Sequence, residues 1–188
     1  RLVEEGADIL DVGGESTRPG ARAVSVEEEC ARVMPVIEGL SNSVSVPISV
    51  DTTKAEVARR ALDCGASWIN DISAGRFDRS MPDVAARYGC PVVLMHSRAT
   101  PGTMQKNPAY ENVVDEVETE LRVAVDMFVA REVRRQNLVL DPGIGFAKRL
   151  EDNLALLAGL EQLSAVGLPL LVGTSRKSFV GAITGREV

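Results

Sequence analysis

The stretch "VPISVDTTKAEVARRALDCGASWIND" (46–71) carries the pattern that decides the fold. Its first part, 46–51, is apolar and β-branched, which predicts a short strand, and the amphipathic part 54–64 predicts a helix. A second strand-length run follows at 67–71. A strand, a helix and a strand in this order predict a βαβ unit whose two strands run parallel.

The same alternation continues on both sides of this unit. Upstream, "ADILDV" (7–12) predicts a strand, and 25–41 predicts a helix with its apolar residues on one stripe. Two capping boxes are expected, Ser25 with Glu28 and Thr53 with Glu56. Downstream, helices are expected at 80–88, 110–135, 151–164 and from Ser178, and strands at "CPVVLMH" (90–96), "NLVLD" (137–141) and "LPLLVG" (168–173).

The number of these units favours an α/β barrel. Six βα units in 188 residues correspond to roughly 31 residues each, so eight would need about 250, the usual size of a (β/α)8 TIM barrel. A doubly wound sheet is the alternative, but no G-x-G-x-x-G follows the first strand. We therefore expect 1–188 to form a single barrel domain, covering roughly strands 2 to 7, with the first strand and the last βα unit absent from this chain.

The composition excludes several classes of protein. The formal net charge of −6 argues against a nucleic-acid surface, which would show a basic stripe. No apolar stretch approaches the length needed to cross a bilayer. Three widely spaced cysteines, Cys30, Cys64 and Cys90, are expected to be reduced thiols of a cytosolic protein.

Polar residues stand where the predicted strands end. In a parallel barrel all carboxyl ends lie on one face, where barrel enzymes carry their active sites, so these residues should converge on a single pocket. For any one of them, loop capping is an equally good explanation; the repetition over successive strands is the signal. They are Asp11, Asp51, Asn70 with Asp71, His96, Asp141 and Ser175.

The residue types indicate what such a pocket binds. Carboxylate and amide oxygens of Asp51, Asn70 and Asp141 suit the N–H edge of a flat ring, and Lys177 offers a movable cation. "GTSRKS" (173–178) opens a helix and can hold an anion. Phe146, which ends "DPGIGF" (141–146), would form an aromatic wall.

The loop "DVGGESTRPGAR" (11–22) has no hydrophobic period and is expected to form a mobile lid. Gly13 and Gly14 would supply the hinge, Thr17 and Arg18 the polar contacts, and Pro19-Gly20 the turn. "ATPGTMQ" (99–105) is a candidate second lid. For two other polar residues a structural role is preferred: a hydrogen bond to a loop for His96, instead of base catalysis, and bracing for Asp71.

The motifs together resemble the dihydropteroate synthase family, and they keep their order over essentially the whole chain. This resemblance implies a TIM barrel that condenses 6-hydroxymethyl-7,8-dihydropterin pyrophosphate with p-aminobenzoate in folate biosynthesis, releasing pyrophosphate and usually needing Mg²⁺. It further implies a cytoplasmic homodimer and a sulfonamide target. The motifs are "ADILDVGGESTRPGA", "SVDTTKAEVARRAL", "INDISAG", "VVLMHSRATPGTMQ", "LDPGIGFAK" and "LVGTSRKSFVG".

The resemblance also implies roles for individual residues. The family's catalytic groups correspond to Asp51, Lys177, Thr17 and Arg18. Its pterin-pocket residues correspond to Asp51, Asn70, Met95, Asp141 and Lys177, and its p-aminobenzoate contacts to Ser175, Lys177 and Phe146, with Thr17, Arg18 and Pro19 from the loop.

Two family segments have no counterpart in this sequence: "N-x-T-x-D-S-F", whose Asn meets Mg²⁺, and the terminal "R-x-H". No metal ligand is therefore expected in this chain, and we expect little turnover if 188 residues are the entire polypeptide. Two alternatives remain open. One is a non-catalytic pterin-binding paralogue or inactive fragment. The other is a methyltetrahydrofolate–corrinoid methyltransferase, which would have no reason to keep "STRPGA" and "SRKSF".

Overall fold

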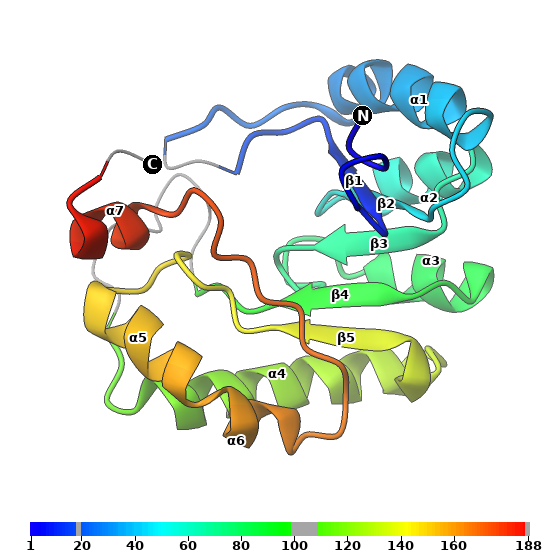
Figure 1. Cartoon of the computed structure of the whole chain (residues 1–188). Coiled ribbons are helices and arrows are strands. Elements are labelled where there is room, and N and C mark those ends of the chain that lie inside the picture. Colours follow the sequence, from blue (N-terminus) through cyan, green and yellow to red (C-terminus); the bar gives the residue numbers. More distant parts are fainter. Residues whose placement is uncertain (18–19, 99–108, 187–188) are drawn as a thin grey trace.

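A computed structural model describes residues 1–17, 20–98 and 109–186, which form a parallel sheet with helices along its outer face (Figure 1). The strands follow one another in chain order. They are β1 (Leu10–Gly13), β2 (Ile48–Asp51), β3 (Trp68–Asp71), β4 (Val92–Met95) and β5 (Leu138–Asp141). The helices are α1 (Val26–Ser41), α2 (Ala55–Asp63), α3 (Met81–Tyr88), α4 (Val113–Ala130), the 3-10 turn η1 (Arg135–Asn137), α5 (Leu150–Ala158), α6 (Leu160–Ser164) and α7 (Ser178–Thr184).

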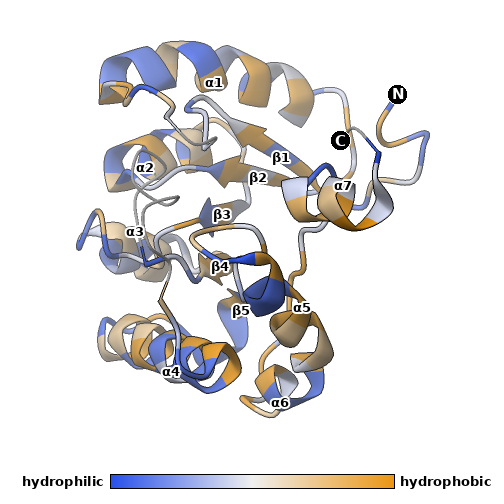
Figure 2. Ribbon diagram, turned by 90° about the vertical axis from the view of Figure 1, so that its left-hand side faces the viewer, coloured by the Kyte–Doolittle hydropathy of each residue, from blue (hydrophilic) through white to orange (hydrophobic). Residues whose placement is uncertain are grey.

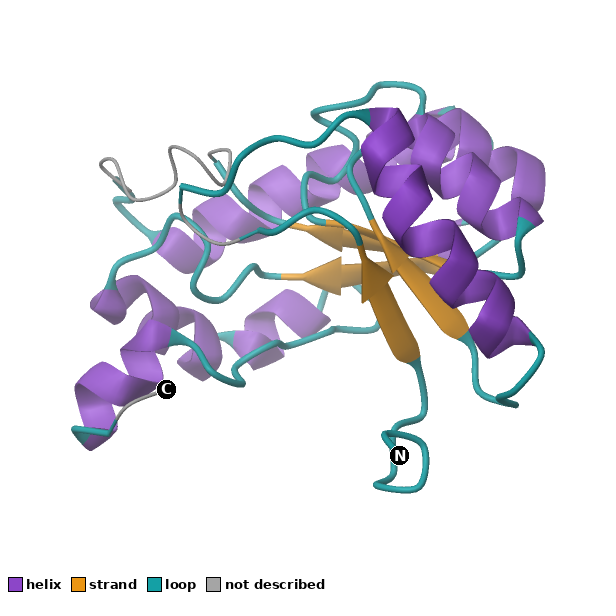
Figure 3. Ribbon diagram, turned by 90° about the horizontal axis from the view of Figure 1, so that it is seen from above, coloured by secondary structure: helices purple, strands orange, loops and turns teal. Residues whose placement is uncertain are grey.

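This arrangement confirms the predicted α/β class and forms part of a barrel wall. All four strand pairs are parallel and join sequential strands, as in a barrel and unlike a doubly wound sheet, whose strand order reverses. Seen from above, the strand direction turns progressively across the sheet (Figure 3). That turning is the twist that lets a parallel sheet curve toward closure.

One face of the sheet packs against the helices. Side chains alternate between the two faces of a strand, and partners in a parallel register share a face. Val50, Ile69, Val92 and Leu138 are successive partners across β2 to β5, and all four are fully buried. They join one hydrophobic core with the inner sides of the helices, whose blue and orange alternation is visible along α1 and α4 (Figure 2).

The opposite, concave face carries the predicted site residues. Asp51 is the register partner of Asn70, Asn70 is the partner of Val93, and Met95 is the partner of Asp141. Because Val93 and Met95 are two positions apart, all of these side chains project from the same face of the sheet. The carboxylates of Asp51 and Asp141 therefore lie on one face, at the same end of the strands.

Only half of one of the two predicted capping boxes is present, because the Glu28 carboxylate pairs with Arg32 instead of reaching back to Ser25. The Ser25 hydroxyl accepts a hydrogen bond from the Glu28 amide at 3.2 Å and caps α1. The prediction for Thr53 was wrong, since α2 begins after Lys54. There the Ala55 amide donates to Asp78 Oδ2 at 2.8 Å. A carboxylate from the loop after β3 thus caps α2 in place of a local side chain. The sequence pattern within 53–56 cannot show this, because Asp78 lies outside it.

Two predicted elements differ in the structure. "LPLLVG" forms only a single bridge, Leu140 with Leu170, instead of a sixth strand. Pro169 has no N–H to donate, which interrupts a ladder at this point. The predicted helix 151–164 is two helices, α5 and α6, which meet at Gly159. A Cβ at Gly159 would lie 2.8 Å from Val114 Cγ1 of α4, so the break occurs where α4 leaves no room for a side chain.

The three cysteines are free thiols, as expected: Cys30 and Cys90 are buried and Cys64 is partly buried. Within the ranges that the structure describes, no helix is long and apolar enough to pass through a membrane.

Candidate active site

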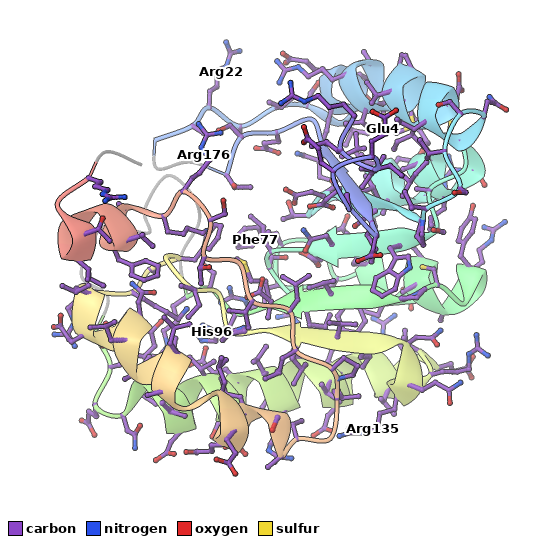
Figure 4. All side chains as sticks on the ribbon, viewed as in Figure 1. Glu4, Arg22, Phe77, His96, Arg135 and Arg176 are labelled. Atoms are coloured by element: carbon purple, nitrogen blue, oxygen red, sulfur yellow. The ribbon has the colours of Figure 1, made fainter. Side chains whose placement is uncertain are left out.

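The loops that follow the carboxyl ends of the strands gather on one side of the molecule, together with α7 (Figure 1). A cavity of about 340 Å³ opens there between the loop after β1 and the ends of β2 and β3. Phe77 lies beyond the end of β3 and forms part of the cavity wall (Figure 4). The cavity is lined by Glu15, Ser16, Thr17, Ala21, Ala23, Glu29, Asp51, Thr52, Thr53, Ile72 and Phe77.

Asp51 ends β2 and faces this cavity. Burial raises the pKa of its carboxyl to about 8, and the negative charges of Asp11 and Glu29 add to the rise. A carboxyl in this setting holds its proton until a positive or N–H-rich partner arrives. Raised carboxyl pKa values in a cavity are a physical mark of a functional site.

Asn70 of β3 is hydrogen-bonded across β2 to Asp11 of β1. Its side-chain amide donates to Asp11 Oδ2 at 2.9 Å. Asp71, the next residue, turns to the helix-covered face and is fully buried. Its carboxylate accepts hydrogen bonds from the amides of Ser73 (2.8 Å) and Gly75 (2.7 Å), which confirms the predicted bracing role.

A partly buried ion cluster supports the cavity wall, and the sequence analysis did not find it. Lys54 pairs with Glu15 of the loop and donates to Glu29 Oε2 of α1 at 2.5 Å. Glu29 is 1% exposed, and its Oε1 has no hydrogen-bond partner within the described ranges. The three residues come from three separate segments, so no local motif marks them.

The two glycines that open the loop pack closely against their surroundings, and Gly14 more tightly than Gly13. A Cβ at Gly13 would lie 3.3 Å from Asp51 Oδ2, and a Cβ at Gly14 would lie 2.8 Å from Val33 Cγ1. Any side chain at Gly14 would push the loop off α1. Their predicted role as a hinge stays a prediction.

The second half of the site lies at the ends of β4 and β5. Burial raises the pKa of the Asp141 carboxyl to about 6, and the Gly143 amide, which donates to Oδ1 at 2.7 Å, opposes the rise. The positive charges of Lys148 and Lys177 oppose it as well. Lys177 Nζ stands 4.1 Å from the centre of the Phe146 ring, a cation–π contact.

The predicted histidine bond is present, and it involves a lysine that sequence analysis overlooked. His96 Nε2 lies 2.9 Å from Glu120 Oε2 of α4, and its Nδ1 lies 3.0 Å from Lys148 Nζ. Burial lowers the pKa of His96 to about 4 and that of Lys148 to about 7. His96 lies beyond the end of β4, near the turn after β5 (Figure 4).

The remaining predicted residues occupy different settings. Thr17 lines the cavity with Asp51, Met95 is buried on the concave face, and Ser175 is exposed in the loop before α7. Arg18 and Pro19 lie outside the described residues, as does the second predicted lid at 99–105.

Polar groups at the carboxyl ends of a curved parallel sheet define the class of an α/β barrel enzyme site. Comparison with known proteins makes this assignment specific. The family model described as "Pterin binding enzyme" matches residues 1–188, and the chain belongs to this family.

The relatives that the chain resembles are named dihydropteroate synthase. It is 47% identical to one from Synechocystis over 97% of this chain and 63% of the relative, and 47% identical to one from Bacillus subtilis over 97% and 61%. The chain thus spans less than two thirds of these curated relatives.

Solved structures show the same likeness. The Yersinia pestis dihydropteroate synthase, determined with a sulfonamide drug complex, superposes with a TM-score of 0.96 at 42% identity, covering 100% of this chain and 68% of that one. The Xanthomonas albilineans enzyme in complex with 7,8-dihydropteroate has a TM-score of 0.89 at 44% identity, covering 100% and 66%. These neighbours confirm the fold as a barrel.

Proposed function

We propose that this protein is a dihydropteroate synthase, which condenses 6-hydroxymethyl-7,8-dihydropterin pyrophosphate with p-aminobenzoate. One observation carries the proposal most directly: Asp51, Asn70, Met95 and Asp141 project from one face of the sheet at its carboxyl end. In the reaction, a C–O bond to pyrophosphate breaks at the exocyclic methylene. A C–N bond to the arylamine then forms, and the amine loses a proton.

The buried carboxyl of Asp141 suits the pterin ring. Asp141 would accept the ring N–H groups, because one of its oxygens is already fixed by the Gly143 amide and its raised pKa lies below that of Asp51. Asn70 would add amide contacts, and Met95 would cover the apolar face of the ring. Buried charge-assisted hydrogen bonds of this kind give both affinity and orientation.

Asp51 would act on the reacting carbon. Departure of pyrophosphate leaves a positive charge on the methylene and the ring, and a carboxylate in a low-dielectric cavity stabilises such charge. The cationic ring in turn would lower the raised pKa of Asp51 and favour its ionised form.

Lys177, Phe146 and Ser175 would hold p-aminobenzoate. The cation and the ring already lie in contact, which offers a charged end and an aromatic wall for a flat anionic substrate. Thr17 lines the cavity beside Asp51, which supports the proposal that its loop closes over the reaction and excludes water. Arg18 and Pro19 are proposed to join it from the same loop.

Mg²⁺ is proposed only as a companion of the substrate's pyrophosphate. Within residues 1–17, 20–98 and 109–186, no group of three or more His, Cys, Asp or Glu side chains could hold a metal ion. No step of the reaction is therefore assigned to a metal ligand of this chain.

Further parts of the proposal follow from the family resemblance. We propose that 1–188 acts as one pterin-binding domain, that the protein is a cytoplasmic homodimer, and that sulfonamides compete for the p-aminobenzoate position. Competition kinetics with a sulfonamide and light scattering of the purified protein test the inhibitor and the dimer separately.

Calorimetry followed by turnover tests the function itself. The protein should bind dihydropterin pyrophosphate and then release pyrophosphate only when p-aminobenzoate is added. Binding without product would identify a non-catalytic pterin-binding protein instead. Methyl transfer from methyltetrahydrofolate to a corrinoid acceptor, without pyrophosphate chemistry, would replace the proposal by a methyltransferase.

A further inference from the structure

The ring of His96 lies between an anion and a cation, and this fixes which nitrogen carries its proton. Nε2 faces Glu120 Oε2 at 2.9 Å, and Nδ1 faces Lys148 Nζ at 3.0 Å. A carboxylate only accepts hydrogen bonds and an ammonium only donates them. The neutral ring protonated at Nε2 satisfies both neighbours.

In its protonated form, Lys148 has three acceptors for its three N–H groups. Besides His96 Nδ1, they are the His96 carbonyl at 3.3 Å and the Phe146 carbonyl at 3.1 Å. Two of these acceptors belong to the residue after β4, and the third belongs to the turn after β5. The ammonium therefore ties the 142–146 turn to the neighbouring strand end.

Asp141, the residue before this turn, and Phe146, its last residue, both belong to the proposed site. His96 N donates to the Asp141 carbonyl at 2.9 Å. At Gly143, which has φ +69, a Cβ would lie 1.9 Å from the His96 carbonyl oxygen, so the turn rests directly on that backbone. A shift of the turn relative to His96 would move the Asp141 carboxylate at one end and the Phe146 ring at the other.

A second link holds the same region. Glu120, the partner of His96, also accepts from Arg98 Nε at 2.8 Å, and the Arg98 guanidinium lies 4.3 Å from the centre of the Tyr110 ring. The Tyr110 hydroxyl donates to the Ala147 carbonyl at 3.2 Å. The turn is thus connected to α4 both through the imidazole and through the tyrosine.

We propose that Lys148, oriented by the neutral imidazole of His96, is a positioning residue that sets the shape of the 142–146 turn and so aims Asp141 and Phe146 at the substrates. The inference rests on the proposed function for its catalytic consequence. The geometry of the turn can be tested without any substrate.

The first test compares Lys148→Met with Arg149→Met. Methionine keeps much of the length of the side chain but donates no hydrogen bond, and Arg149 is a neighbouring cation that pairs with Asp152 instead of His96. Because His96 is the only histidine, ¹⁵N-histidine labelling reports on one ring. Lys148→Met should shift the Nδ1 resonance and increase exchange of the Gly143 and Gly145 amides at least about tenfold.

Control measurements distinguish a local change in the turn from a general loss of stability. The Ser73 and Gly75 amides, held by Asp71, should keep their exchange rates in Lys148→Met. Arg149→Met should leave the His96 signal and all of these amides unchanged. If Lys148→Met does not fold, Lys148→Gln keeps N–H donors without the charge and should show the same changes with smaller amplitude.

The second test measures substrate handling. Lys148→Met should raise the Kd for dihydropterin pyrophosphate about tenfold, the scale of one hydrogen bond to a charged group, while Arg149→Met stays within about twofold. A shifted His96 signal with unchanged glycine exchange and unchanged Kd would overturn the proposal, because Lys148 would then be structural only. If the unmodified protein binds no pterin, the proposed function fails, and the glycine exchange still decides the role of Lys148.

Discussion

The two halves of the site use the same residue type in opposite electrostatic settings. Asp51, at the end of β2, faces the negative charges of Asp11 and Glu29, and its pKa rises to about 8. Asp141, at the end of β5, has Lys148 and Lys177 beside it, and its pKa rises only to about 6. Burial is the largest cause of both rises, and the neighbouring charges add to the rise at Asp51 and oppose it at Asp141.

The contrast assigns different tasks to two chemically identical groups. A carboxyl that resists ionisation until positive charge appears is suited to the step in which charge develops. A carboxyl that ionises near neutral pH is suited to steady recognition of N–H donors. Each prediction below tests whether the two halves differ in this way.

The largest effect is expected for Asp51→Asn on turnover. Loss of the carboxylate should slow the chemical step about 10²- to 10³-fold, as when a preorganised electrostatic contact is removed elsewhere. Single-turnover pyrophosphate release measures it, and Asp126→Asn on the exposed side of α4 is the matched control. A decrease of only a few fold in the rate of pyrophosphate release would show that Asp51 does not act in the chemical step.

Asp141→Asn should act on binding instead. Losing a charge-assisted hydrogen bond to the ring should weaken dihydropterin pyrophosphate binding by roughly 1.5–3 kcal/mol. Calorimetry gives the value directly. Unchanged affinity would contradict the recognition role, and a loss in turnover alone would make Asp141 resemble Asp51 and erase the contrast.

Lys54→Met tests the half of the site around Asp51, where the neighbouring charges are negative, by its effect on the free energy of unfolding. The substitution leaves Glu29 buried without its cation, which should lower the free energy of unfolding by about 1–2 kcal/mol. Urea unfolding measures the change. The double variant Lys54→Met with Glu29→Gln should recover part of the loss, because the unpaired charge is gone; no recovery would mean that Lys54 stabilises the fold by packing.

The fold could be predicted from the sequence because the apolar periodicity of each strand and helix lies within that element. Apolar runs such as 48–51 and 92–95 lie inside the predicted strands, and α1 and α3 begin one residue from the predicted points. The errors came from non-local contacts. At Ala55 the cap is supplied by Asp78, and at Gly159 the close approach of α4 accompanies a break that the apolar pattern does not show.

The site divides along the same line. Asp51, Asn70 and Asp141 could be predicted because they lie at or next to the carboxyl ends of strands, and these ends share one face of a parallel barrel. The lysines at positions 54 and 148 could not, because their partners lie 25 and 52 residues away, at Glu29 and His96. Only the folded chain shows which charges meet.

The sharpest test of the contrast is the pH dependence of stability. A carboxyl whose folded pKa is raised keeps its proton in the folded state after the unfolded state has lost it, so its contribution to stability falls as pH rises. For Asp51 this fall should continue from about pH 4 up to about pH 8, and for Asp141 it should end near pH 6.

The asparagine variants cannot ionise and lack this fall. The unfolding free energy of Asp51→Asn, minus that of the unmodified protein, should therefore keep growing between pH 6 and pH 8, whereas the same difference for Asp141→Asn should already be constant there. Urea unfolding at pH 5, 6, 7 and 8 measures both curves. If the two differences level off at the same pH, the neighbouring charges do not distinguish the carboxyls, and the division of tasks between the two halves is wrong.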